Sequence, residues 1–389
     1  MLPFPSALLL NPGGGAIPPY PFYAASAAEV THVGNSSWTA LVSQTFTGLT
    51  IGVKYAAFFS GEFGIGSVNT NCIGRMTLDG AQLRALLHRP SVVSGSYQSL
   101  AGFQVFTATA TSHTLVVDIQ NGTAASTAKA KNGRIVLLPL GADDYETYSS
   151  GIVTATTTTP VTAATLAFTP ASSEDYLILA SANVASTSTA SNSIMTVALS
   201  GNATPANELV TGSGTGTNNY AHLIAWKRAA LSGAQSVTVR VAENGSATAN
   251  IKEISVLALR LDRFANSAVA ELGAEESGTA TTYTDSHTQT ITAAHANYLT
   301  IGALAVGSST TTAQAASARM DDGTGQTGTS VHYAQASGSG KYQPAAFLGV
   351  AEQAAGSVTQ KLQRKAETSN TVYIAPGSAL VALDLTGIA

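Results

Sequence analysis

The sequence predicts an all-β protein made of three tandem antiparallel β-sandwich domains that follow an extended N-terminal arm. Two observations carry this prediction: a repeat of about 120 residues, which is long enough for a whole domain, and a composition typical of β-sheets. Only 10% of the 389 residues are charged, so helical surfaces with paired charges are not expected. Short runs rich in Thr and Val, broken by Gly, Asn and Ser, favour antiparallel sandwiches.

An apolar run led by a tyrosine marks each copy of the repeat. The three tyrosines are Tyr55, Tyr176 and Tyr298, with steps of 121 and 122 residues. A strand-like piece that ends in a glycine turn follows each of them, and a leucine-rich strand closes each copy. The glycines are Gly80, Gly201 and Gly323, and the closing leucines are Leu140, Leu261 and Leu385. We therefore expect domains at residues 29–141, 142–264 and 265–389.

Residues 1–28 stand outside the repeat and form the predicted arm. They hold six of the thirteen prolines, and proline favours extended backbone without a core of its own. The arm lacks the basic region and the long apolar run of a secretory signal. It is either a mobile tail or a segment that packs against the first domain or a neighbouring subunit. The candidate interaction residues are Leu8, Leu9, Leu10, Tyr20, Phe22 and Tyr23.

The first domain contains a segment without counterpart in the other copies, AQLRALLHRP at residues 81–90. Its leucines recur at helical spacing and a proline follows, which predicts a short helix. Arg84, His88 and Arg89 form a small basic cluster on this segment. We interpret the cluster as a solvated helix face, with a docking contact for an acidic partner as the alternative.

Residues that could carry out chemistry are few. Cys72 is the only cysteine, so an intramolecular disulfide and a cysteine-rich zinc site are excluded, and we expect this side chain to be buried. The seven histidines show no metal-ligand spacing. The acidic pairs at Asp143 and Asp321 occupy turn positions, where local hydrogen bonding explains them; weak calcium binding is the alternative. We expect no enzymatic activity, no catalytic residues, no cofactor and no metal site.

Charge and hydropathy restrict the partners. The net charge of −4 and the absence of a basic stripe disfavour nucleic acid. No apolar run approaches the roughly 18–20 residues that a spanning helix needs, so membrane insertion is not expected. Trp38 and Trp226 lie at non-equivalent places in their repeats, which leaves tyrosines as the alternative platform for a carbohydrate.

The order of landmarks in each copy resembles the jelly-roll heads of the complement-C1q and tumour-necrosis-factor type, with LSGAQSVTV from Leu231 and AAGSVTQKL from Ala354 as matching segments. The composition is similar to that of decoration, head-fibre and tail proteins of tailed bacteriophages. The first resemblance implies jelly-roll-like domains that form trimers through aromatic residues of an inner sheet. Only the first domain, with residues such as Phe58 and Phe103, is aromatic enough for that role.

The resemblances together imply a structural protein located in a virion. Such a protein would be attached through its arm and first domain, with other virion proteins as partners and a homo-oligomer, a trimer first, as its assembly. The alternative function is an adhesin or carbohydrate-binding array that recognises a host-surface glycan, in which tandem copies add avidity.

Overall fold

The computed structural model describes residues 20–66, 71–89, 97–123, 126–187, 192–200, 207–212, 220–243, 245, 247–309, 316–324, 326–332, 342–367 and 370–388. Within these ranges the regular structure is β-sheet, antiparallel except for one parallel bridge between Thr211 and Tyr342, with one short 3-10 turn, Leu261–Arg263. The all-β fold expected from the sequence is confirmed. No described helix is long and apolar enough to cross a bilayer.

The first sandwich consists of two facing sheets. Its strands are β1 (Tyr23–Ser26), β2 (Val30–Val33), β3 (Thr39–Thr47), β4 (Lys54–Ile65), β5 (Cys72–Leu78), β6 (Ala81–Arg89), β7 (Tyr97–Thr107), β8 (Ser112–Asn121) and β9 (Thr127–Pro139). The inner sheet has the order β1-β9-β4-β7, with β2 also paired to β9, and the outer sheet has the order β3-β8-β5-β6. Two antiparallel sheets connected in this way form a jelly roll.

The second and third sandwiches repeat this strand order. The second contains β10 (Tyr145–Ser149), β11 (Val153–Ala155), β12 (Val161–Phe168), β13 (Glu174–Ser186), β14 (Asn192–Leu199), β15 (Asn207–Gly212), β16 (Tyr220–Leu231), β17 (Gln235–Glu243) and β18 (Ala249–Arg260). The third contains β19 (Ser267–Glu271), β20 (Glu276–Gly278), β21 (Thr284–Ala293), β22 (Ala296–Ser308), β23 (Ala316–Asp321), β24 (Gln326–His332), β25 (Tyr342–Gln353), β26 (Gly356–Ala366), β27 (Val372–Ile374) and β28 (Ala379–Asp384). Their outer sheets are β12-β17-β14-β15 and β21-β26-β23-β24. The tyrosine-led runs are β4, β13 and β22, the central strands of the inner sheets.

These central strands are buried on both faces, and the second face explains how the sandwiches meet. In β13, Tyr176 and Ile178 belong to the core of the second sandwich. Leu177 and Leu179, which alternate with them, belong to a core shared by all three sandwiches. A strand covered on both faces needs a nearly continuous apolar run, which is the pattern that first marked the repeat.

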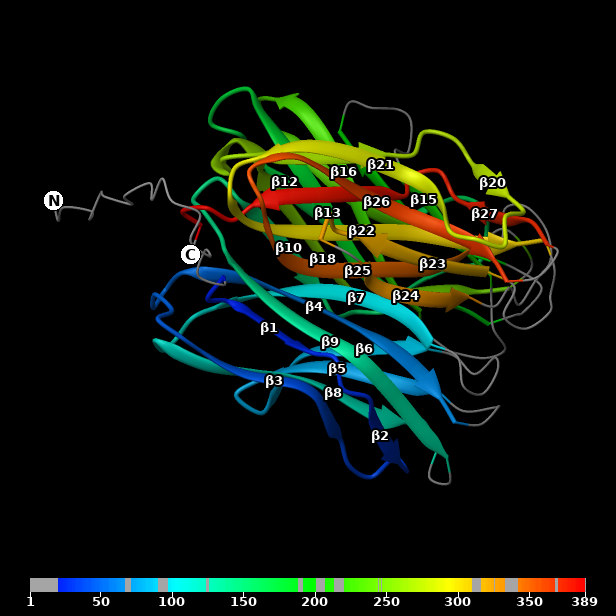
Figure 1. Cartoon of the computed structure of the whole chain (residues 1–389). Helices are drawn as coiled ribbons and strands as arrows, with labels where there is room; N and C mark the ends of the chain where they lie inside the picture. Colours follow the sequence, from blue (N-terminus) through cyan, green and yellow to red (C-terminus); the bar gives the residue numbers. More distant parts are fainter. Residues whose placement is uncertain are drawn as a thin grey trace, which may run out of the picture.

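The three sandwiches contact one another in a closed ring. The edge strand β6 of the first outer sheet contacts β16 of the second sandwich, β15 contacts β25 of the third, and β24 contacts β7 of the first. Each contact joins the last strand of one outer sheet to the equivalent inner-sheet strand of the next sandwich. The third contact leads back to the first sandwich and closes the ring, as in a threefold arrangement. Figure 1 shows the first sandwich, in blue and cyan, below the other two. The shared core combines aromatic side chains of the first inner sheet, among them Phe58 and Phe103, with aliphatic side chains of the second and third inner sheets.

Residues 81–90 do not form the expected helix. The structure has strand β6, Ala81–Arg89, paired with β5. The pairing shifts register between Gly74 and Met76 and again between Met76 and Thr77, so β6 is an irregular edge strand. Local spacing favoured a helix, but pairing with β5 overrides that preference. The expected arm also ends earlier than residue 28, because β1 pairs with β9 from Tyr23 onward.

Candidate functional site

Three of the six predicted interaction residues pack on their own first sandwich. The hydroxyl of Tyr20 donates to the carbonyl of Leu137 at 3.0 Å. The ring of Tyr20 meets Phe22 edge-on at 5.9 Å, and Phe22 meets Tyr55 in the same way. Burial raises the pKa of Tyr20, and the nearby charge of Arg263 opposes this shift. Tyr20 and Phe22 are buried and Tyr23 is half-buried, whereas Leu8, Leu9 and Leu10 lie outside the described residues.

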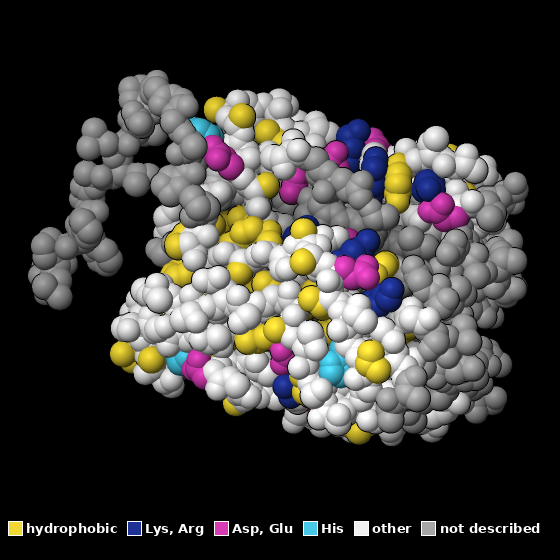
Figure 2. Space-filling view, turned by 60° about the horizontal axis from the view of Figure 1, so that its bottom comes forward, with side chains coloured by type: hydrophobic (Ala, Val, Ile, Leu, Met, Phe, Trp, Pro, Cys, Tyr) yellow, Lys and Arg dark blue, Asp and Glu magenta, His cyan; other side chains and the backbone are white. Residues whose placement is uncertain are grey.

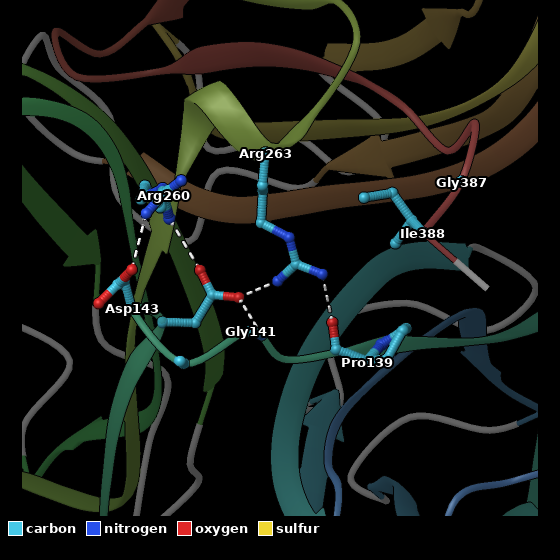
Figure 3. Close-up of a pocket in the computed structure, with 9 residues that line it drawn as sticks. Pro139, Gly141, Asp143, Arg260, Arg263, Gly387 and Ile388 are labelled. Atoms are coloured by element: carbon cyan, nitrogen blue, oxygen red, sulfur yellow. Dashed lines mark hydrogen bonds and ion pairs between the residues drawn. The ribbon is translucent and has the colours of Figure 1, made fainter. Parts of the chain in front are cut away.

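A hollow of about 370 Å³ opens where the ends of the three repeats converge. It is lined by Pro139 and residues 141–144 at the end of the first sandwich, by Arg260 and Arg263 at the end of the second, and by Gly387 and Ile388 at the end of the third. Figure 3 shows Arg263 reaching the Pro139 carbonyl, with Ile388 on the opposite side of the hollow. Tyr20 also lies close to Arg263. The described chain therefore begins and ends at the same end of the molecule, which we call the junction end.

The charged side chains around this hollow form ion pairs with one another. Arg263 pairs with Asp144 and donates to the Pro139 carbonyl at 2.7 Å. The Asp144 carboxylate also accepts the backbone N–H groups of Gly141 at 2.7 Å and Arg260 at 2.9 Å. Arg260 lies 2.6 Å from Asp143. Each of these carboxylates has a cationic partner, and the cluster joins the two interdomain connections.

Arg84 is the most unexpected polar residue of the ring. It was predicted to lie on a solvated surface, but it is fully buried where the first and second sandwiches meet. Its guanidinium donates to the Phe103 carbonyl at 2.6 Å and, across the contact, to Ser255 Oγ at 2.8 Å and Ser181 Oγ at 3.0 Å. The Glu253 carbonyl accepts a further bond at 2.8 Å. Burial lowers the pKa of Arg84 to about 10, opposed by the charge of Glu253, so the group remains a cation at neutral pH.

Glu253 presents its carbonyl to Arg84 through a local irregularity of β18. The backbone there has φ 53°, and the pairing with β13 shifts between Ser181 and Asn183. Asn132, 121 residues earlier, has the same φ at the equivalent shift of β9. A bulge of this kind redirects a backbone group, and in the second sandwich it supplies the acceptor for a neighbouring domain. The leucine spacing of β6 gave no signal for this contact.

Two other sequence predictions concern the cysteine and the acidic pair of the third domain. Cys72 is buried, as expected. Asp321 and Asp322 accept the backbone N–H groups of Gly323 and Thr324, each at 3.0 Å, which is the local turn role expected of them.

The two tryptophans differ in burial, and a tyrosine of the third sandwich lies at a position similar to that of Trp38. Trp226 is only 1% exposed, whereas Trp38 and Tyr283 are half-buried at the start of the outer sheets of the first and third sandwiches. Figure 2, which brings the first sandwich forward, shows a mostly neutral surface with charged side chains in small separate groups. The two tryptophans of the sequence give no signal for this shared position, because a tyrosine, Tyr283, stands in the third repeat where the first has Trp38.

No family model matches the sequence and no curated protein matches it. Solved structures with similar folds include the triple jelly roll of an archaeal virus turret, 10% identical over 93% of this chain and 91% of that one, with a TM-score of 0.22. The infectious bursal disease virus VP2 particle protein is 6% identical over 95% and 83%, with a TM-score of 0.23. The sugar-binding C-terminal domain of EclA is 19% identical over 32% and 86%, with a TM-score of 0.22. These neighbours are viral capsid proteins and a carbohydrate-binding domain, and TM-scores this low carry no argument about function.

Proposed function

We propose that this protein is a structural component of a virus particle of the tailed-bacteriophage type, as a decoration, head-fibre or tail protein without enzymatic activity. It is held by its N-terminal arm and presents its jelly rolls outward. The observation that supports this proposal is the closed ring of three sandwiches within one chain. The ring has a defined junction end, at which the described part of the chain begins and ends.

The junction end is the proposed side of attachment. Tyr20 and Phe22 fix the base of the arm to the first sandwich, so the residues before them start from a fixed point. Those residues include the apolar sequence of Leu8, Leu9 and Leu10. Burial of apolar surface contributes about 25 cal/mol per Å² before ordering costs are subtracted. A short arm of this composition can therefore hold the protein to another virion protein, or to further copies of this chain in the expected trimer.

Deletion of residues 1–19 tests this proposal. We expect the shortened protein to keep the far-UV circular dichroism and the urea midpoint of the full chain, because Tyr20 and Phe22 remain. It should no longer co-sediment with particles assembled in its presence. The matched variants are Leu8→Ser with Leu9→Ser and Leu10→Ser, which should behave like the deletion, and Asn11→Ala, which should behave like the full chain. Undiminished co-sedimentation of the shortened protein would overturn attachment through the arm.

A second function, recognition of a host-surface carbohydrate, is favoured by a different observation. Two of the three outer sheets carry an aromatic ring with an arginine above it and a hydrogen-bonding partner for that arginine on the next strand. Outer sheets are also the surfaces that ring formation leaves accessible.

A further inference from the structure

The pairing register identifies three equivalent positions on the outer sheets. Trp38, Pro160 and Tyr283 each precede the first outer strand, immediately before the residue that pairs with Ile119, Val241 or Arg364. On the neighbouring strands Arg75 pairs with Asp118, Thr196 with Arg240, and Arg319 with Gln363. The first and third sandwiches therefore share an aromatic residue and an arginine that the second sandwich lacks.

The group of the first sandwich consists of Trp38, Arg75 and Asp118. The guanidinium carbon of Arg75 lies 4.0 Å from the centroid of the Trp38 ring. Both Nε and one terminal nitrogen of Arg75 lie 3.2 Å from the same Asp118 oxygen. Trp38 belongs to no hydrophobic core of the described residues. The ring thus lies on the sheet surface, beside a donor and an acceptor held in fixed positions.

The group of the third sandwich has the same arrangement with more polar partners. The guanidinium carbon of Arg319 lies 4.0 Å from the Tyr283 ring centroid, and its Nε donates to Gln363 Oε1 at 2.6 Å. Gln363 in turn donates to Asp285 at 2.6 Å. Lys361 lies 2.9 Å from the same carboxylate. Burial tends to raise the pKa of Asp285, but the bonds from Lys361 and Gln363 outweigh it and lower this pKa, so an ionised acceptor is present at neutral pH.

We propose that the Trp38 and Tyr283 groups are two saccharide-binding sites and that the second sandwich has none. A hexose presents a C–H face that packs on an aromatic ring and vicinal hydroxyls that both donate and accept hydrogen bonds. In both groups the guanidinium covers one face of the ring, so the contact with the sugar would use the remaining exposed part of the half-buried ring together with the guanidinium, carboxylate and amide groups next to it. This inference deepens the second function above, and its failure would leave attachment through the arm unaffected.

The charges of the two groups favour a neutral ligand over a phosphate. Arg75 is balanced by Asp118, and Lys361 is balanced by Asp285 with Asp321 nearby. The carboxylates that pair with these cations would repel a phosphate. A sugar hydroxyl, in contrast, can donate to a carboxylate and accept from a cation at the same time. Shallow sites of this kind are expected to bind with dissociation constants of about 1 mM. Two sites on one chain would then act together on a surface that displays many sugars.

Tryptophan fluorescence of the full chain measures the first site directly, because Trp226 is 1% exposed and Trp38 reports on added ligand. The probes are the methyl glycosides of galactose, glucose, mannose and N-acetylglucosamine, with sodium phosphate as the comparison. We expect a saturable change with at least one glycoside and none with phosphate. Saturation-transfer NMR should give the same ligand preference and also report on Tyr283.

Variants then separate the two sites. Trp38→Ala and Tyr283→Ala should each reduce the NMR transfer by about half, and the double variant should abolish it. Pro160→Ala, at the equivalent position of the second sandwich, should leave it unchanged. Equal urea midpoints of all variants will show that they are folded. The proposal is overturned if no glycoside gives a saturable response, if the double variant still binds, or if phosphate binds instead.

Discussion

The inner and outer sheets of each sandwich have similar strand pairing but different surroundings. In β13 and β22 of the inner sheets, the residues from Tyr176 and Tyr298 onward are buried without interruption. In β12 and β21 of the outer sheets, buried and exposed residues alternate. The inner sheets therefore hold the three sandwiches together. Their side chains must fit, and find hydrogen-bond partners among, neighbours on both faces of the sheet. The side chains of the outer sheets must pack on one face only. The other face is exposed, and there the repeats differ in sequence.

The two kinds of sheet should differ most in the free energy of unfolding that is lost when a side chain is shortened to alanine. Leu179 is fully buried in the core shared by the three sandwiches, so Leu179→Ala should lower the free energy of unfolding by about 2–5 kcal/mol. Thr165→Ala on the exposed face of β12 should change it by less than about 0.5 kcal/mol. Urea unfolding measures both. Similar midpoints for the two variants would contradict the existence of a shared core.

Replacement of the buried Arg84 by alanine tests the hydrogen bonds inside the ring. Arg84→Ala removes the partner of Ser181, Ser255 and two carbonyl groups inside the ring. Because these groups stay buried, we expect a loss of about 3 kcal/mol in the free energy of unfolding. Arg84→Met keeps the volume of the side chain and should cost less than Arg84→Ala. A loss no larger than that of a surface arginine would show that the buried hydrogen bonds do not hold the first two sandwiches together.

Acid should weaken the inner sheet of the second sandwich through His222. Burial lowers its pKa to about 3, below the ordinary value of about 6.5, and neither ring nitrogen has a hydrogen-bond partner among the described residues. Between these pH values the unfolded chain binds a proton that the folded chain does not. The free energy of unfolding should thus fall by up to about 1.4 kcal/mol per pH unit as the pH drops from about 6.5 towards 3.

The variant His222→Leu isolates this contribution from that of acidic groups. Hydrogen bonds lower the pKa of Asp175, so carboxylates also lose stabilising contacts in acid. The variant keeps those carboxylates, and urea unfolding at about pH 7 and about pH 5 should show a smaller loss in the variant than in the unmodified chain. An equal loss in both proteins would place the acid sensitivity elsewhere.

The smallest effect is expected for Arg75→Ala on the outer sheet. Arg75 keeps 22% of its side chain exposed and Asp118 keeps 12%, whereas Arg84 is fully buried, so the loss in the free energy of unfolding should be about 1 kcal/mol and smaller than for Arg84→Ala. The midpoint of urea unfolding should therefore move little, while saccharide binding at Trp38 should weaken. A large loss of stability with unchanged binding would instead assign the pair a purely structural role.

The sequence alone determined the all-β class, the threefold repeat and the buried strands that begin at Tyr55, Tyr176 and Tyr298. Alternation and period are local properties, so residues near in the chain are sufficient to show them. The uninterrupted apolar character of DYLILASANV, from Asp175 to Val184, also indicated a strand without a solvent face. It did not show what covers the second face, because the covering residues come from another sandwich.

Only the tertiary structure decided how the repeats meet and which residues they bury. Arg84 is polar and its leucine neighbours have helical spacing, yet pairing with β5 and contact with β16 place it inside the ring. The junction, where Pro139, Arg263 and Ile388 converge, likewise does not follow from the order of domains along the chain. The bonds from Arg84 to Ser255 and from Arg263 to Pro139 join residues more than a hundred positions apart, and such tertiary contacts outweigh local preference.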